Sequence, residues 1–445
     1  MTGARFLRLG LAAVCLSVLL VLVSAVLFTR SDSASPQPLS RGPVAASEVA
    51  TSGDLSATIA SLQSRLQRLP SDSESWAALG AAYVQQARIT GDPSYYPKAA
   101  GVLARSLKES PTDNAAALTG EAALAAARHD FQGAFRLTSK AMDINSFNSA
   151  TMAIQFDALV ELGRYDDALR ALKRYAGLKP GVPAYTRISY NYELHGNLQG
   201  ARYAMRRALD IAYSPDDRAF ALFELGELAW NAGHLEEASS LYRQGWRADP
   251  TYVANLYGLA KTDAGLGRTD RAVLRYQDVI NRLPQPTYII EYADLLTSLG
   301  RTDDAAAQGR LIDAQQRIFR AAGVNLDLEL ALYDASHGRP LRALEQARQA
   351  WHERKSIFVE DAYAWALHVN GHDRVALRHL DSAERLGTRS ALFAFHRGMV
   401  QRSLGDRAAA VASLREALAI NPAFNPVFAG QARQALRALA RGELR

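Results

Sequence analysis

The 445-residue chain has a single cysteine, Cys15, so it has no pair of cysteines with which to form an internal disulfide. Since Cys15 lies in an apolar run near the start, the rest of the chain also has no thiolate with which to bind a metal. Only seven of the 51 basic residues are lysine, which we attribute to a general compositional preference for arginine. These absences exclude a disulfide scaffold and thiolate metal sites.

The chain also lacks the motifs of common enzymes. It has no phosphate-binding loop, no nucleophile elbow and no metal-ligand spacing. The nearest constellation is a group of histidines that includes His368 and His372, but Gly371 is expected to end the helix between these two. Because the repeats described below also leave no room for a separate catalytic domain, we predict a non-enzymatic protein without a cofactor or metal.

The charge balance argues against a nucleic-acid partner. The chain has 51 basic and 45 acidic residues, and three of the basic residues, Arg5, Arg8 and Arg30, flank the N-terminal apolar run. The remainder is close to neutral and contains no basic run. Because binding to phosphates needs a clustered positive footprint, we expect a protein or peptide partner, with no nucleic acid and no small-molecule substrate.

A small residue recurs at intervals of 33 to 38 positions along most of the chain. These residues are Ala99, Ala134, Ala168, Ala201, Ala238, Ala272, Ala305, Ala343, Ala376 and Ala410. In the last eight cases a glycine stands five residues earlier, as Gly163 does before Ala168. A fixed period of this length is typical of an array built from one supersecondary unit.

Each unit is predicted to be a pair of helices. Around Ala168, apolar residues three or four positions apart indicate a helix before Gly163 and another after it. Gly163 is placed to end the first helix in a left-handed conformation, and Pro180 to end the second. An alanine at position 168 allows the two helices to approach closely, where a leucine would clash.

These units resemble the tetratricopeptide repeat (TPR) over residues 72–422. The residues that carry the resemblance in the first, fifth and last units are Trp76, Leu79, Gly80 and Tyr83; Leu222, Leu225, Gly226, Gly233, Ala238, Tyr242 and Pro250; and Gly398, Gly405, Ala410, Leu414, Ala417 and Pro422. The resemblance implies an all-α fold, a right-handed superhelical solenoid of about ten helix-turn-helix repeats. The alternative is an irregular helical bundle without true repeats.

The N-terminal part is predicted to anchor the chain in a membrane. Residues 9–28 form an apolar run of the length that spans a bilayer, after a short N-terminus at 1–8 that contains Arg5 and Arg8. The excess of basic residues before the run predicts a cytoplasmic N-terminus and an extracytoplasmic array. The alternative is a cleaved signal peptide and a secreted protein.

Three further segments complete the predicted organisation. Residues 31–53, rich in Ser, Pro and Ala, are expected to be a flexible tether. Residues 54–422 are assigned to the solenoid, including an N-terminal packing helix with Leu55, Leu62 and Leu69 on its apolar face. Residues 423–445 are assigned to a C-terminal capping helix, which a solenoid end requires.

The resemblance also implies that the first helices of successive units line a concave binding face. Counting back from the alanines places a set of aromatic and polar residues there, and we predict that these residues contact a partner. They are Tyr190, Glu193, Phe220, Phe223, Glu227, Trp230, Asn231, Tyr257, Lys261, Trp365 and Arg402. Aromatic anchors beside single charges are typical of peptide grooves. The alternative is that several of these side chains are packed between neighbouring helices.

Two related functions follow from these patterns. The first is a membrane-tethered scaffold of the bacterial cell envelope that holds a protein or peptide in the concave groove. The second is a chaperone-like factor in envelope protein maturation, because residues 62–80 are similar to the start of the repeat domain of a cytochrome c assembly factor. The second membrane helix of that factor is missing here. No pattern in the sequence identifies the partner.

Overall fold

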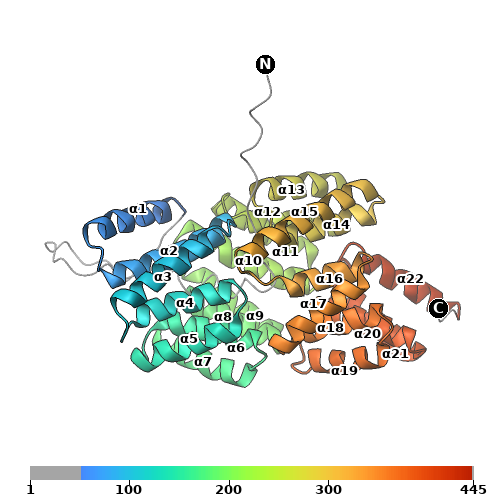
Figure 1. The fold of residues 1–445 in the computed structure, drawn as a ribbon. Helices are drawn as coiled ribbons and strands as arrows, with labels where there is room; N and C mark the ends of the chain where they lie inside the picture. The colour runs from blue at the N-terminus through green and yellow to red at the C-terminus, as the bar shows by residue number, and fades with distance from the viewer. Residues whose placement is uncertain (1–51, 443–445) are drawn as a thin grey trace, which may run out of the picture.

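The computed structural model describes residues 52–442, which form 22 helices and no strand. Twenty helices pair into ten hairpins, which we number from the N-terminus (Figure 1). Hairpins 1 to 5 are α2 (Ser73–Thr90) with α3 (Tyr95–Glu109), α4 (Ala115–Ala127) with α5 (Phe131–Ile144), α6 (Ser149–Glu161) with α7 (Tyr165–Leu178), α8 (Val182–Leu194) with α9 (Leu198–Asp210), and α10 (Pro215–Asn231) with α11 (Leu235–Ala248). Hairpins 6 to 10 are α12 (Val253–Gly265) with α13 (Thr269–Arg282), α14 (Pro286–Ser298) with α15 (Thr302–Ala321), α16 (Asp327–Ser336) with α17 (Pro340–Glu353), α18 (Ile357–Val369) with α19 (Asp373–Ala383), and α20 (Ala391–Ser403) with α21 (Arg407–Ile420). The array is therefore an all-helical solenoid.

The turn inside each hairpin has the predicted conformation. All eight glycines that precede the recurring alanines have a positive φ, for example 75° at Gly163. In hairpin 2 the corresponding residue is His129, which adopts a φ of 64° although it carries a side chain. In hairpin 1 the longer turn places Gly91, with a φ of 63°, directly after α2. The period therefore reflects one turn geometry repeated along the chain.

The recurring alanines lie where the two helices of a hairpin meet. Nine of the ten are at most 1% exposed, and Ala305 is half-buried. The close approach is also visible at Gly226, where a Cβ atom would lie 2.3 Å from Cε1 of Tyr242 in the second helix of the same hairpin. Small residues at these positions are therefore required by packing.

First and second helices differ in burial. In hairpin 3, the first helix α6 buries ten of its 13 residues, whereas the second helix α7 buries four of 14. Successive first helices contact one another along most of the array, while second helices contact mainly their own partner and the next first helix. The first helices therefore line the inside of the curve and the second helices form its outer face.

The solenoid also packs against itself between distant hairpins. The turns of hairpins 2 to 5 lie against the loops that follow hairpins 7 to 10, so that α5 to α9 lie beside α16 to α20 (Figure 1). A Cβ atom on Gly163, in the turn of hairpin 3, would lie 2.2 Å from the carbonyl oxygen of Lys355. The corresponding glycines of hairpins 4 and 5, Gly196 and Gly233, approach Gly387 and Ile420 in the same way. One superhelical turn therefore takes five to six hairpins.

Hydrogen bonds join the stacked turns at each step. The amide N–H of Ile357 donates to the Tyr165 hydroxyl at 2.9 Å, and the Asn421 side chain donates to the carbonyl oxygen of Trp230 at 2.7 Å. Between them, Thr388 donates to the carbonyl oxygen of Leu194. Residues about 190 positions apart are thus held together by buried polar contacts as well as by packing.

Helices α1 (Ser52–Arg68) and α22 (Phe428–Ala440) lie at the two ends of the array. Leu55 and Leu62 are buried as predicted, but Leu69 follows the end of α1 and is 50% exposed, because the helix stops before the next inward position. The segments predicted for residues 1–8, 9–28 and most of 31–53 lie outside the described residues. Within residues 52–442, no helix combines the length and apolar character needed to cross a membrane.

Candidate partner-binding surfaces

Polar side chains from successive first helices form a series of contacts on the inside of the curve. Glu193 of α8 accepts a hydrogen bond from Asn231 of α10 at 2.9 Å, and both carboxylate oxygens of Glu227 in α10 accept from Lys261 of α12 at 2.7 and 2.8 Å. Glu193, Glu227 and Lys261 are spaced 34 residues apart, so each occupies the same position in its hairpin. We call Glu193, Glu227, Asn231, Lys261 and Glu291 the inner-face ladder.

Glu291 of α14 completes the ladder through two phenols. The hydroxyl of Tyr257 donates to its Oε1 at 2.5 Å and that of Tyr276 to its Oε2 at 3.2 Å. The ammonium of Lys261 lies 5.0 Å from the ring centroids of both Trp230 and Tyr257. The structure therefore brings Trp230, Tyr257 and Lys261 together, three of the residues predicted for the concave face, and places Glu291, which was not among the predicted residues, beside them.

The eleven predicted contact residues differ in exposure. Those that are at most 7% exposed are Phe220, Phe223, Trp230, Tyr257, Lys261 and Trp365. Tyr190, Glu193, Glu227 and Arg402 are half-buried, and Asn231 is exposed. Their contact with a partner remains a prediction, and in this structure the half-buried and exposed members are the accessible ones.

Phe220 and Phe223 are packed between neighbouring helices, which was the alternative to contact with a partner. The ring of Phe223 is 5.7 Å from that of Tyr242 and 6.0 Å from that of Tyr252, while Phe220 packs edge-on against Tyr252 at 6.4 Å. These rings fill the core between hairpins 5 and 6. Stacking of distant turns also shields Trp230, whose carbonyl accepts from Asn421.

Trp365 and Arg402 lie in hairpins 9 and 10, away from the ladder. The Trp365 ring stacks on His396 with centroids 4.3 Å apart, and its Nε1 donates to Ser336 at 3.3 Å. The predicted set therefore does not form one continuous surface. Its central part is the ladder between α8 and α14.

Carboxyl groups predominate on this inner face. Burial raises the pKa of Glu193 to about 6 and also raises that of Glu291. The pKa of Glu224 is raised further by burial and by the nearby Glu227 and Glu193, and its buried Oε1 accepts no hydrogen bond from residues 52–442. Lys261 is the one cation of the ladder, so acidic groups are in excess on the inner face. Glu193, Glu224 and Glu291 hold their protons more tightly than they would in water.

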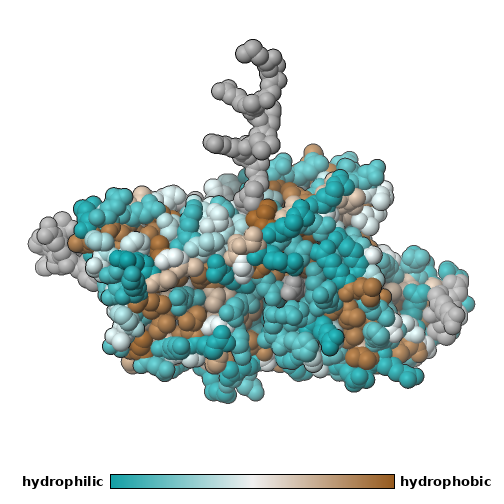
Figure 2. Space-filling view, viewed as in Figure 1, coloured by the Kyte–Doolittle hydropathy of each residue, from teal (hydrophilic) through white to brown (hydrophobic). Residues whose placement is uncertain are grey.

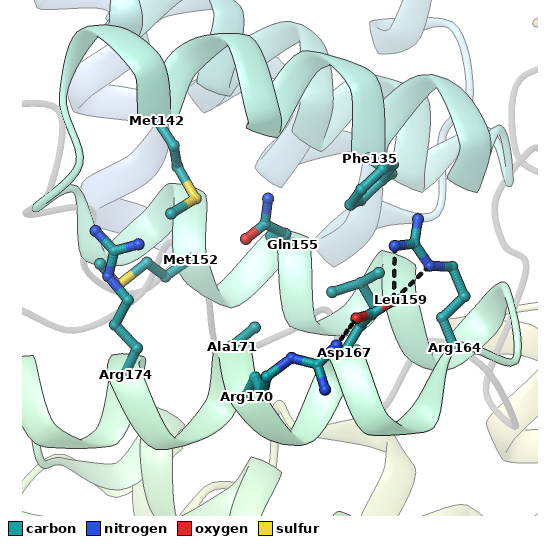
Figure 3. A pocket seen from close by; sticks show the side chains of 10 residues that line it. All are labelled: Phe135, Met142, Met152, Gln155, Leu159, Arg164, Asp167, Arg170, Ala171 and Arg174. Atoms are coloured by element: carbon teal, nitrogen blue, oxygen red, sulfur yellow. Dashed lines mark hydrogen bonds and ion pairs between the residues drawn. The ribbon is translucent and has the colours of Figure 1, made fainter.

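A second surface lies outside the curve, where no residue was selected from the sequence. A pocket of about 300 Å³ opens between α5, α6 and α7 (Figure 3). Phe135 and Met142 line it from α5, and Met152, Gln155 and Leu159 from α6. The sequence signal for this pocket is the placement of two of the chain's five methionines, Met142 and Met152, within eleven residues, on a side of the hairpins where no partner contact was predicted.

The histidines of hairpins 9 and 10 do not converge on a common point. His368 pairs with Asp373 at 2.5 Å, His379 with Glu360 at 2.6 Å and His396 with Asp361 at 2.9 Å. Among residues 52–442, no group of three or more His, Asp or Glu side chains is arranged to hold a metal ion. Each of these histidines therefore has a separate acidic partner.

Comparison with known proteins identifies the repeat type of hairpin 10. Residues 393–424, which cover nearly all of α20 and the whole of α21, match the family model described as tetratricopeptide repeat. Hairpin 10 is thus recognised directly, and the other hairpins share its turn geometry. No curated protein matches the chain.

Several solved structures have a similar helical fold. The APC/C hetero-tetramer Cut9–Hcn1 is 15% identical, with a TM-score of 0.43 over 86% of this chain and 81% of that chain. YrrB, described as a TPR protein with an unusual peptide-binding site, is 17% identical, with a TM-score of 0.28 over 41% of this chain and 92% of that chain. A monomeric mutant of IFIT1 with Gppp-AAAA is 12% identical, with a TM-score of 0.46 over 75% of this chain and 77% of that chain.

Proposed function

Because the chain is built from tetratricopeptide repeats, we propose that it is a non-enzymatic scaffold that holds a protein or peptide partner on its inner face. The observation that supports this most is the inner-face ladder, in which polar groups from four hairpins are aligned and only partly covered. Glu224 beside it is half-buried, and its Oε1 is enclosed and accepts no hydrogen bond from residues 52–442. A partner with donor groups, such as a basic or amide-rich segment, would bind the half-buried carboxylates Glu193 and Glu227.

We also propose that residues 9–28 tether the scaffold to a bacterial membrane, with the array on the outer side. This proposal rests on the apolar run and on Arg5 and Arg8 before it. A reporter enzyme fused after the last residue tests it. Activity only with an extracytoplasmic reporter supports the orientation, and activity only with a cytoplasmic reporter overturns it.

A chaperone-like role in envelope protein maturation is the second candidate. It is favoured by the similarity of residues 62–80 to the start of an assembly factor's repeat domain. The two candidates differ in what the chain captures. A scaffold would retain folded envelope proteins, whereas an assembly factor would retain unfolded precursors, haem-protein precursors above all.

Capture experiments with the full chain from envelope extract test the proposed function. The informative variant is Glu224→Gln, which keeps the size of the side chain and replaces a carboxyl group whose pKa is raised by burial with an amide. The matched control is Glu236→Gln, at an exposed position on α11, whose side chain is 67% exposed. We expect Glu224→Gln to reduce capture while Glu236→Gln leaves it unchanged; a partner set that is the same with both variants would contradict binding at the inner face.

A further inference from the structure

The pocket between α5, α6 and α7 has an apolar floor and a cationic rim. Met142, Met152 and Leu159 supply the floor, together with Phe135. Met152 is 2% exposed and Met142 is half-buried, and both point into the space between the helices (Figure 3). Methionine side chains are flexible and polarisable, so such a floor adapts to apolar groups of different shape.

Three arginines and one aspartate form the rim. Arg164 directly precedes α7, and Asp167, Arg170 and Arg174 lie in the first ten residues of this helix. Asp167 lies between Arg164, whose Nε donates to it at 2.8 Å, and Arg170 (Figure 3). The hydrogen bond from Arg164 lowers the pKa of Asp167, so this carboxylate stays ionised. The third arginine, Arg174, donates to the carbonyl oxygen of Ser146 at 2.9 Å and forms no ion pair with an acidic side chain of the described residues. The rim therefore has a net charge of about +2 beside an apolar cavity.

We propose that this outer pocket binds an acidic peptide segment of a partner protein, with one apolar side chain in the cavity and carboxylates at Arg170 and Arg174. This goes beyond the proposed function, because it assigns a second surface, on hairpins 2 and 3, whereas the ladder lies on hairpins 4 to 7. A volume of about 300 Å³ is at the small end for ligand sites and leaves room for an apolar side chain such as leucine.

The spread of the rim favours a peptide over a free aliphatic acid. Arg164 precedes α7 and is paired with Asp167, so the proposed carboxylate contacts fall at Arg170 and Arg174, which are about 6 Å apart along the helix axis. Acidic side chains two residues apart in an extended peptide are roughly 6.6 to 7.2 Å apart and match this spacing, whereas a free aliphatic acid has one carboxylate for both arginines. Phe147, which is 75% exposed and follows Ser146, adds apolar surface beside Arg174.

The surface around the pocket is consistent with an interaction site. The face seen in Figure 2 is mostly hydrophilic, and apolar side chains gather at its lower left, over α4 and α5. Exposed apolar residues near the mouth include Phe147 and Ile144, which is 40% exposed. Apolar surface with a charged rim is typical of sites where another protein docks.

Methionine-methyl NMR of the full chain tests this proposal directly. With carbon-13 in the methionine methyl groups, Met142 and Met152 report on the pocket, while Met205 and Met399 serve as internal references. The probe is the peptide acetyl-Glu-Asp-Leu-Asp-Glu-amide. We expect saturable shifts of the Met142 and Met152 signals and unchanged Met205 and Met399 signals.

Matched probes and variants separate the alternatives. Replacing the leucine of the peptide by serine should abolish the shifts, and replacing its acidic residues by lysine should do the same. The double variant Arg170→Gln with Arg174→Gln should weaken binding about tenfold, as expected for two exposed charge contacts, while the control Arg207→Gln on α9 should not. These arginines are exposed, so the variants are expected to fold.

Two results would overturn the proposal. One is the absence of shifts at millimolar peptide, or equal shifts with the lysine peptide. The other is saturable shifts with decanoate and none with the acidic peptide, which would identify the pocket as a site for an aliphatic acid. Neither outcome depends on Glu224 or on the capture experiment, so failure here and failure of the inner-face proposal can be told apart.

Discussion

The stacking of distant superhelical turns can be tested with two glycines that have the same backbone conformation. Gly163 has a φ of 75° and Gly267 a φ of 73°. A Cβ atom on Gly163 would lie 2.2 Å from the carbonyl oxygen of Lys355, whereas one on Gly267 would have no neighbour within 4 Å. Alanine at the two positions therefore causes the same left-handed strain but only one clash between turns.

The expected magnitudes differ for that reason. Left-handed backbone costs an alanine about 1–2 kcal/mol, and the lower entropy of the unfolded chain offsets about 0.4–1 kcal/mol of this. Gly267→Ala should therefore destabilise the protein by about 1 kcal/mol. Gly163→Ala adds overpacking of about 1–3 kcal/mol and disturbs the buried Arg354–Glu161 ion pair, whose atoms are 2.7 Å apart. We expect a total loss of about 2–5 kcal/mol.

Urea unfolding measures both losses from the transition midpoints and slopes. Small-angle scattering of the folded proteins adds a second readout, because separation of the stacked turns would increase the radius of gyration in Gly163→Ala only. Equal destabilisation of the two variants, with equal radii of gyration, would show that hairpin 3 does not contact the loop after hairpin 8 in solution.

Two further predictions concern buried charge. Burial raises the pKa of Asp217 to about 7, so the folded state binds the carboxyl proton of Asp217 more tightly than the unfolded state does. The stability that comes from this proton is therefore lost as the pH rises from about 4 to about 7. Relative to the wild type, Asp217→Asn should therefore gain on the order of 2 kcal/mol more free energy of unfolding at pH 8 than at pH 5, whereas the exposed control Asp270→Asn should show no such difference. Parallel pH profiles for all three proteins would contradict this. Arg187 forms a fully buried ion pair with Asp157, with Nε 2.9 Å from Oδ1. Arg187→Ala leaves the carboxylate buried without its partner and should lower the free energy of unfolding by about 3–5 kcal/mol. The double variant Arg187→Met with Asp157→Leu should stay within about 2 kcal/mol of the wild type. Thermal and urea unfolding check both, and a double variant less stable than Arg187→Ala would refute the reasoning.

Much of the local structure could be predicted because its causes are local. Gly163 ends a helix in the left-handed region, and Ala168 five residues later lies at the closest approach of two helices. The same causes recur in every hairpin, so the number and position of the helical pairs follow from the sequence. The proximity of Trp230, Tyr257 and Lys261 follows in the same way from the register of neighbouring hairpins.

The stacking of turns could not be predicted because it depends on how small rotations between hairpins add up. Nothing near Trp230 indicates that Asn421, 191 residues later, binds its carbonyl oxygen. For the same reason, how far the concave face is covered could not be predicted from the residues that line it. The outer pocket was not predicted, for a different reason. Met142 and Arg174 lie on second helices, which the family resemblance places on the convex side, whereas partner contacts were expected on the concave side.

The contacts between hairpins 3 and 8 have a consequence for how this protein folds. Arrays of repeats are usually described as chains of nearest neighbours, each stabilised by the unit before and after it. Here the contact of Tyr165 with Ile357 closes a loop of 192 residues, and the entropy of closing it must be lost before the contact forms. During synthesis, the first hairpins therefore remain without their later partners until the ribosome has made the last third of the chain. Until then the turns at Gly196 and Gly233 lack the backbone of Gly387 and Ile420, which lies against them in the finished molecule, so the nascent array exposes a face that completion of the second turn covers.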